Sequence, residues 1–162
     1  MCRIWFLGAA TAMNLLLTTV GHRKNVPSEA AGALLLSYIA RSARYAPTTH
    51  RAFPSEADLL RFLQESATRT RPYLLLTDST GEQISSPELA AVVTGLFDRG
   101  IQTLVLAIGP ADGWSPAARQ RADKTIAFGR ITLPHELAAV VAAEQLYRAL
   151  TIRAGHPYHS GH

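Results

Sequence analysis

Two patterns of apolar and polar residues alternate along this chain. Short apolar runs bounded by glycine, proline or polar residues are typical of buried strands. Such runs occupy residues 15–20, 73–76, 101–108 and 125–128, and residues 48–53 form a weaker candidate. Between them, apolar residues recur at three- and four-residue spacing, which is typical of helices with one buried face. The chain is therefore predicted to alternate strands with helices.

The predicted helices have recognisable starts. A serine beside a proline or a glutamate opens four of them, at residues 27–29, 54–56, 86–88 and 115–116. Pro134 opens the last, where Glu136 in the first turn complements the positive helix end. In the first helix the spacing predicts a core face of Leu34, Leu35, Tyr38 and Ile39. After the third strand, residues 79–81 predict a turn.

Strands that are apolar on both faces and alternate with helices favour an α/β fold with a parallel sheet covered on both sides. In such sheets, ligands sit beyond the carboxyl ends of the strands. Three of these ends are candidates for one site: Leu76–Asp78, Ile108–Pro110 and Gly129–Ile131. Periodicity alone leads no further than this.

The length of 162 residues suits one domain. Residues 1–12 loosely imitate a signal peptide, but Gly8 interrupts the apolar run, and only Arg3 precedes it as a positive charge. Met13, just before the first strand, is the more natural beginning. We therefore expect a single domain over 13–162 and an extension over 1–12. No window reaches the ~18 apolar residues that span a membrane.

The charge of the chain bears on the kind of partner that it binds. The formal net charge is +4, and fourteen of the sixteen basic residues are arginines, whose planar fork suits phosphate. RNA binding and a bias of genome composition explain this usage equally well. Cys2 is the single cysteine, so no internal disulfide is possible and a reducing, cytoplasmic location is expected.

Several common sites are disfavoured by missing motifs. The sequence has no G-x-G-x-x-G, no P-loop, no G-x-S-x-G and no cysteine cluster, which argues against dinucleotide, P-loop nucleotide, serine hydrolase and structural zinc sites. His156 and His159 are conceivable metal ligands. No acidic third ligand lies near them in the sequence, so we expect no metal.

The C-terminal third carries a specific pattern. It includes Thr132-Leu133-Pro134-His135, Leu146-Tyr147-Arg148-Ala149 and His156-Pro157-Tyr158-His159, together with Ile108-Gly109, Gly113 and Ser115-Pro116. From Met13 onward the chain resembles the ribosomal large-subunit methyltransferase H family, which are small SPOUT-class enzymes. These methylate N3 of a pseudouridine in 23S rRNA.

The resemblance implies a SPOUT-type parallel sheet flanked by helices, with a C-terminal trefoil knot, in a cytoplasmic homodimer that acts on the ribosome and does not enter membranes. It also implies that S-adenosylmethionine is the cofactor. By carry-over, the residues that bind it are Leu76, Thr77, Gly109, Pro110, Gly129, Arg130, Ile131, Thr132, Leu133 and Pro134.

For catalysis the candidates are Tyr158 and His159, which supply acid–base groups and a stacking face for an exposed base. Taken without the resemblance, a frayed polar tail is the simpler interpretation. Contact with rRNA is expected from Arg23, Lys24, Arg148, Arg153 and His156, although solvated surface charges explain the basic ones equally well.

Other residues are open to a structural interpretation. His135 is as suited to a structural hydrogen bond as to a place beside the cofactor. Glu144 interrupts an apolar helix face, and we expect it to pair with an arginine. Trp114 is expected in the core, with the rim of the pocket as its alternative.

The chain departs from the family at Pro110, where relatives carry a second glycine. Proline has no amide to donate and cannot adopt positive φ. The run from Gly109 to Ser115 also looks like the corresponding loop of the 16S rRNA uridine N3-methyltransferases. Two alternatives therefore stand beside the main hypothesis: an enzyme for another rRNA uridine, and a non-catalytic ribosome-binding protein.

Overall fold

A computed structural model describes residues 12–21 and 28–160. Its centre is a sheet in the order β2-β1-β4-β3-β5, in which every described pair of neighbouring strands is parallel. The strands are β1 (Asn14–Val20), β2 (Thr48–Phe53), β3 (Tyr73–Gln83), β4 (Thr103–Ile108) and β5 (Lys124–Ala127). This confirms the predicted α/β class, including the weak strand candidate at 48–53.

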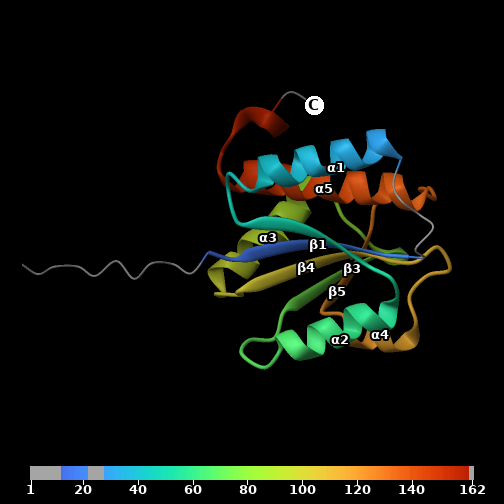
Figure 1. The fold of residues 1–162 in the computed structure, drawn as a ribbon. Coiled ribbons are helices and arrows are strands. Elements are labelled where there is room, and N and C mark those ends of the chain that lie inside the picture. Colours follow the sequence, from blue (N-terminus) through green and yellow to red (C-terminus); the bar gives the residue numbers. More distant parts are fainter. Residues whose placement is uncertain (1–11, 22–27, 161–162) are drawn as a thin grey trace, which may run out of the picture.

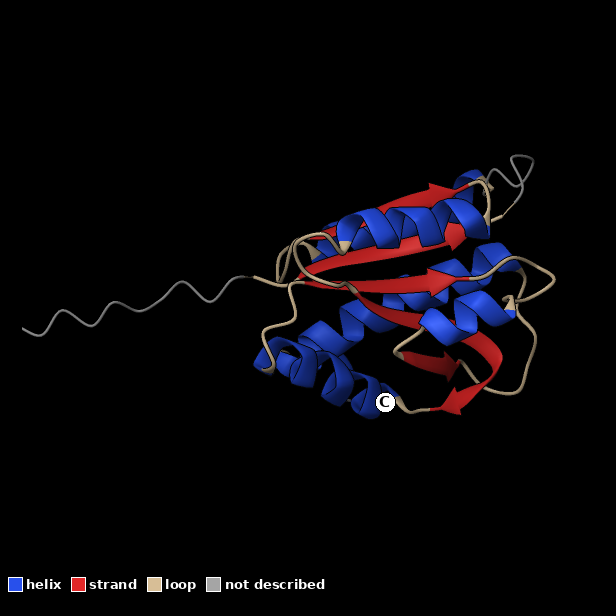
Figure 2. Cartoon of the chain, turned by 90° about the horizontal axis from the view of Figure 1, so that it is seen from below, coloured by secondary structure: helices blue, strands red, loops and turns tan. Residues whose placement is uncertain are grey.

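Helices cover both faces of the sheet (Figures 1 and 2). On one face lie α1 (Glu29–Ser42), α3 (Ser86–Asp98) and α5 (His135–Arg153), and on the other lie α2 (Glu56–Ser66) and α4 (Pro116–Arg121). The short 3-10 helix η1 (Pro157–His159) follows α5. None of the described helices is long and apolar enough to cross a membrane.

Successive side chains of each strand point to opposite faces of the sheet and so feed two separate cores. In β4, Leu104 and Leu106 pack with α1, α3 and α5, whereas Val105 and Ala107 pack with α2, α4 and Trp114. The central strands are buried on both faces, which explains why their sequences are apolar without alternation.

Three of the four serines that mark predicted helix starts are confirmed as caps. Ser28, Ser55 and Ser115 each accept a hydrogen bond from a backbone amide of the first turn. For α3 the cap is Ser85 rather than Ser86, and Ser85 and Glu88 complete a reciprocal capping box. Such bonds satisfy amides that have no partner within the helix, so they fix where each helix begins.

Two sequence predictions were wrong. Leu34 does not face the core, because the residue is 47% exposed, whereas Leu35 is buried. Residues 79–81 do not form a simple turn, because β3 continues to Gln83 and pairs with β5 again after a shift in register between Thr77 and Glu82. Gly81 permits this second pairing, since a Cβ there would lie 2.6 Å from the backbone of Ile126. The trefoil knot stays a prediction.

Candidate functional site

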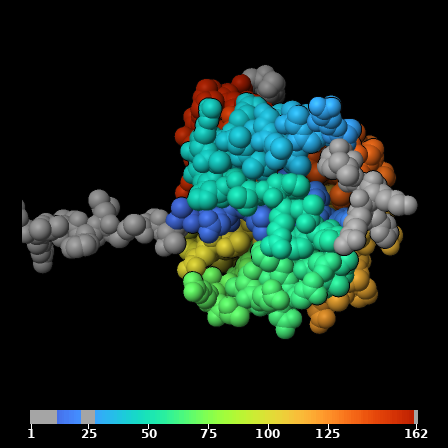
Figure 3. Space-filling model, viewed as in Figure 1, coloured from blue at the N-terminus to red at the C-terminus, as the bar shows by residue number. Residues whose placement is uncertain are grey.

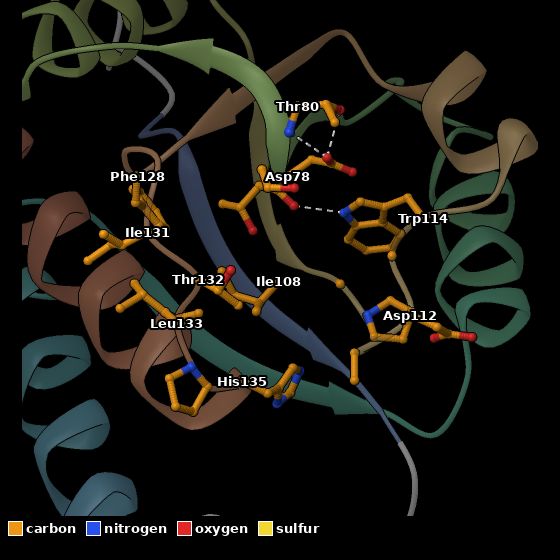
Figure 4. A pocket seen from close by; sticks show the side chains of 18 of the residues that line it. Asp78, Thr80, Ile108, Asp112, Trp114, Phe128, Ile131, Thr132, Leu133 and His135 are labelled. Carbon is orange, nitrogen blue, oxygen red and sulfur yellow. Dashed lines mark hydrogen bonds between the residues drawn. The ribbon is translucent and has the colours of Figure 1, made fainter.

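The carboxyl ends of β4 and β5 and the middle of β3, where its pairing with β5 shifts register, converge on one pocket of about 540 Å³ (Figure 4). The three strand-end segments predicted to share a site all contribute to its lining, through Thr77 and Asp78, Ile108 to Pro110, and Gly129 with Ile131. Thr132, Leu133 and Pro134 line it as well, directly before α5 begins. The pocket therefore occupies the place where parallel sheets bind ligands.

Trp114 forms one wall and fixes the loop that follows β4. Its indole Nε1 donates a hydrogen bond of 2.9 Å to the carbonyl oxygen of Thr77, which joins this loop to the middle of β3. Its ring also lies directly on Gly109, where a Cβ would come within 2.7 Å of the ring. Only glycine fits at 109 while the indole keeps this position.

Pro110 has a defined role in the same loop. Its carbonyl oxygen accepts a hydrogen bond of 3.0 Å from the amide of Gly113, and Gly113 has a φ of +87°. The four residues from 110 to 113 thus form a tight turn whose last residue needs the conformational freedom of glycine. Among described residues, positive φ occurs at glycines alone, so Pro110 is accommodated without backbone strain.

A charged network closes another side of the pocket. The Asp78 side chain, which is 5% exposed, forms an ion pair of 2.7 Å with Arg119. Asp78 Oδ1 accepts hydrogen bonds from the amide and the hydroxyl of Thr80, and Arg119 also donates to the Trp114 carbonyl oxygen. Burial opposes ionisation of Asp78, but the hydrogen bonds from Thr80 and the Arg119 charge hold its pKa below the ordinary value.

Sequence reasoning missed Arg119. It lies 41 positions after Asp78, and no short motif connects the two residues. The single sequence signal was an arginine in the helix that directly follows the Gly109–Ser115 loop.

Apolar side chains and one histidine complete the pocket. Figure 4 shows Phe128, Ile131 and Leu133 on the side opposite Trp114. His135, the first residue of α5, also lines the pocket, and its Nε2 is buried without a hydrogen-bond partner among the described residues. The surroundings are thus largely apolar, with a few fixed polar groups, as is usual in small-molecule sites.

Two of the predicted cofactor residues do not line this pocket. The Leu76 side chain is fully buried in the core between the sheet and α2, one residue before Thr77. Arg130 is exposed and lies between the lining residues Gly129 and Ile131. The other predicted residues surround the pocket.

The C-terminal tail forms a second cluster around Glu144. As expected, Glu144 pairs with an arginine: its Oε1 accepts hydrogen bonds of 2.9 and 2.7 Å from Arg148. The same oxygen accepts from the Tyr158 hydroxyl at 3.1 Å, and Arg148 lies 3.3 Å from His159 Nδ1. Because an arginine N–H can only donate, Nδ1 accepts, which leaves the His159 proton on Nε2.

Tyr158 is held by its ring as well as by its hydroxyl. The ring packs edge-on against Tyr147, and the guanidinium groups of Arg41 and Arg148 lie 5.5 and 4.9 Å from its centroid. Burial, followed by hydrogen bonds with Tyr38 and Glu144, raises the pKa of Tyr158 well above the ordinary value. Tyr158 is therefore a neutral phenol at physiological pH.

The tail and the pocket lie at opposite ends of the molecule. The pocket surrounds the start of α5, whereas the tail packs on its last turns. Figure 1 shows the start of α5 and the segment that follows its last turn at opposite ends of the sheet. At 1.5 Å per residue, the step along α5 from His135 to Arg148 is roughly 20 Å. Tyr158 and His159 therefore do not reach the pocket of their own chain.

The predicted RNA-binding residues are scattered. Arg23 and Lys24 lie outside the described residues. Arg148 is engaged by Glu144, and His156 Nδ1 accepts the amide of Tyr158 at the start of η1. Arg153 is exposed, with its guanidinium 4.0 Å from the centroid of the Phe97 ring.

Comparison with known sequences gives a consistent result. A family model described as a predicted SPOUT methyltransferase matches residues 13–159. The chain is 43% identical over 150 residues to the ribosomal RNA large subunit methyltransferase H of Koribacter versatilis, covering 93% of this chain and 100% of that protein. A protein of the same name from Brucella ovis is 50% identical over 86 residues, or 53% of this chain and 51% of the relative.

Solved structures resemble the fold at low sequence identity. A probable methyltransferase from Bordetella pertussis has a TM-score of 0.54 at 15% identity, covering 87% of this chain and 96% of that one. A probable methylase family protein from Haemophilus influenzae has a TM-score of 0.52 at 10% identity, covering 92% and 70%. These similarities concern the fold alone.

Proposed function

The chain belongs to the SPOUT methyltransferases and, within them, to the ribosomal RNA large subunit methyltransferase H family, and from this premise we propose its reaction. It transfers a methyl group from S-adenosylmethionine to N3 of a pseudouridine in 23S rRNA, of the pseudouridine 1915 type. The observation that carries this proposal is the convergence of β3 and of the loops after β4 and β5 on one pocket at the start of α5.

The pocket suits S-adenosylmethionine. Its volume lies in the range typical of small-molecule sites, and its apolar wall of Phe128, Ile131 and Leu133 suits an adenine ring. Its one guanidinium group, that of Arg119, is already paired with Asp78, which fits a cofactor without phosphate. The buried, unpaired Nε2 of His135 offers a polar contact within the described lining.

Residues of these three segments would hold the cofactor. These are Thr77, Gly109, Pro110, Gly129 and Ile131 to Pro134, with Leu76 and Arg130 contributing through their backbone. When bound, S-adenosylmethionine supplies a methyl group activated by its sulfonium. The task of the protein is then to orient the base, stabilise the charge on it and exclude water.

His159 and Tyr158 have different roles toward the base, hydrogen bonding for the first and stacking for the second. N3 of the base releases its proton to solvent water before it accepts the methyl group, so negative charge develops on the neighbouring carbonyl oxygens. The Nε2–H of His159 is suited to donate a hydrogen bond to such an oxygen. Tyr158 stays neutral and offers a ring that is already fixed in place for stacking.

A homodimer is required to bring these groups to a pocket. The tail lies roughly 20 Å from the pocket of its own chain along α5, so the groups of one subunit complete the site of the other. The outer face of α1 and α5 is suited to such an interface. Leu34 and Leu36 of α1 and Leu137 of α5 are 47%, 59% and 50% exposed, and exposed large apolar side chains are common at interfaces.

Recognition of the substrate depends on the assembled ribosome. A domain this small has little surface with which to grip one nucleotide of naked RNA, so the shape of the ribosome supplies the rest of the contact. We expect methylation of large ribosomal subunits and little methylation of a bare rRNA fragment. Equal rates on the two substrates would contradict this expectation.

The decisive test is methylation of large ribosomal subunits that lack the modification, followed by mass spectrometry of the nucleosides. N3-methylpseudouridine is the expected product, and none should form with His159→Ala. A ribosome-binding protein without cofactor affinity would bind subunits but yield no methylated nucleoside and no calorimetric signal with S-adenosylmethionine.

A second candidate is N3 methylation of another rRNA uridine. It is favoured by the loop from Gly109 to Ser115, in which Pro110 and Trp114 build the turn and the wall of the pocket. The same mass spectra decide between the two, because N3-methyluridine and N3-methylpseudouridine differ in their glycosidic bond and fragment differently.

A further inference from the structure

A line of arginines crosses the end of the sheet at which the strands begin. Arg71 and Arg121 lie just before β3 and β5, and Arg99 directly follows α3, before β4. Arg153 is the last residue of α5 and packs against α3. We call Arg71, Arg99, Arg121 and Arg153 the arginine strip. It lies opposite the pocket and beside the tail.

Asp123 holds two of these arginines in fixed positions. Its Oδ2 accepts the amide of Leu74 at 2.8 Å, which anchors the carboxylate to β3. Arg71 donates to Asp123 at 2.6 Å, and Arg121 lies 3.4 Å from it while also donating to the Pro72 carbonyl oxygen at 3.0 Å. One carboxylate thus positions two guanidinium groups.

Aromatic rings support the other two. The Arg99 guanidinium lies 5.9 Å from the centroid of the Tyr73 ring, and that of Arg153 lies 4.0 Å from the centroid of Phe97. An arginine stacked on a ring leaves the N–H groups at its edge free to donate. The contacts make the strip continuous, since Tyr73 follows Arg71 by two residues and Phe97 precedes Arg99 by two.

Positive charge in the strip exceeds negative charge. Segments 69–73, 97–99 and 121–123 and residue 153 contain five arginines, including Arg69, and two aspartates, Asp98 and Asp123. Burial and then the nearby charge of Arg71 lower the pKa of Arg121. The fold therefore holds like charges together, an arrangement that an additional anion would relieve.

We propose that the arginine strip binds the phosphate backbone of rRNA and guides the strand toward the active site. Arg153 stands immediately before the tail, so the strip of one subunit leads to the groups that complete the pocket of its partner. Guanidinium forks held by a carboxylate and by aromatic rings suit phosphate oxygens and carry no preference for sequence. This inference rests on the proposed function for the identity of its partner.

The test compares two double variants with matched surroundings. Arg71→Gln with Arg99→Gln removes one arginine paired with an aspartate and one stacked on a ring. Arg51→Gln with Arg61→Gln does the same elsewhere, since Arg61 pairs with Asp58 and Arg51 lies 4.6 Å from the centroid of Phe53. All four side chains are exposed, so both variants should fold.

Binding to large ribosomal subunits is measured by co-sedimentation at several salt concentrations. The strip variant should bind about tenfold more weakly, and the slope of log K against log salt should fall by about 1.5, as expected for two lost phosphate contacts. The control variant should stay within about twofold of the native chain, and S-adenosylmethionine affinity should be the same in all three.

Two results would overturn the inference. Equal weakening by both variants would mean that general charge, and not the strip, drives binding. Weaker binding with an unchanged salt slope would mean that the strip contacts a protein or supports the fold. Because binding is measured apart from methylation, a native chain that binds subunits through the strip without modifying them would overturn only the proposed function.

Discussion

At the scale of single residues, the glycine at position 109 and the position of the Trp114 indole depend on each other. The indole lies where a Cβ at 109 would be, and it also donates to the Thr77 carbonyl oxygen. A glycine followed five residues later by tryptophan is visible in the sequence, but their contact is not. Trp114 was predicted to be a core residue with the pocket rim as its alternative, and it is both buried and part of the pocket lining.

We predict that Gly109→Ala weakens S-adenosylmethionine binding by about tenfold, equivalent to ~1.4 kcal/mol. The added methyl group displaces the indole and with it the loop that borders the pocket. Calorimetric titration measures the effect. In a Trp114→Leu background the same methyl group meets no indole and should cost less than about threefold, as a double-mutant cycle would show. Equal losses in both backgrounds would contradict the proposed coupling.

At the scale of secondary structure, the sequence predicted the order of strands and helices well because caps and apolar runs are local signals. Ser28, Ser55 and Ser115 opened their helices as expected. The extension of β3 was missed because it depends on β5, more than forty residues later in the chain. Residues 79–81 are polar and small, so locally they resemble a turn, and only the approach of Gly81 to Ile126 makes them a strand.

Two glycines of neighbouring elements should respond to alanine in opposite ways. At Gly81 a Cβ would meet the β5 backbone at 2.6 Å, so Gly81→Ala should destabilise the fold by about 2 kcal/mol or more. At Gly95, within α3, a Cβ meets nothing within 4 Å, so Gly95→Ala should stabilise by about 1 kcal/mol. Urea denaturation of both variants measures these changes, and a stable Gly81→Ala variant would contradict the close approach of β3 and β5.

At the scale of the whole molecule, the separation of tail and pocket matters most. The resemblance implied that both belong to one site, but the sequence did not reveal that they lie at opposite ends of α5 (Figure 1). Figure 3 shows the tail beside α1 on the outer face that we assign to the dimer interface, and Arg41 of α1 contacts the Tyr158 ring at 5.5 Å. Under the proposed function, a folded chain therefore presents both halves of the site on its surface, each for a partner subunit.

Mixing two inactive variants should restore activity. Thr132→Trp fills the pocket from an exposed lining position, and His159→Ala removes the tail group. After the two are mixed in equal amounts and allowed to exchange subunits, half of the dimers carry one intact site, so about one quarter of native activity should return. If the mixture stays as inactive as its components, the two groups act within one chain.

The distance between tail and pocket also makes catalytic activity depend on the concentration of the protein. Under the proposed function, an isolated subunit has two half-sites and no complete site, so dilution lowers activity. Well below the dissociation constant of the dimer, the amount of active enzyme rises with the square of chain concentration, by mass action. Newly made chains would remain inactive until they dimerise. Methylation would begin only once the cell has accumulated enough of the protein to form dimers.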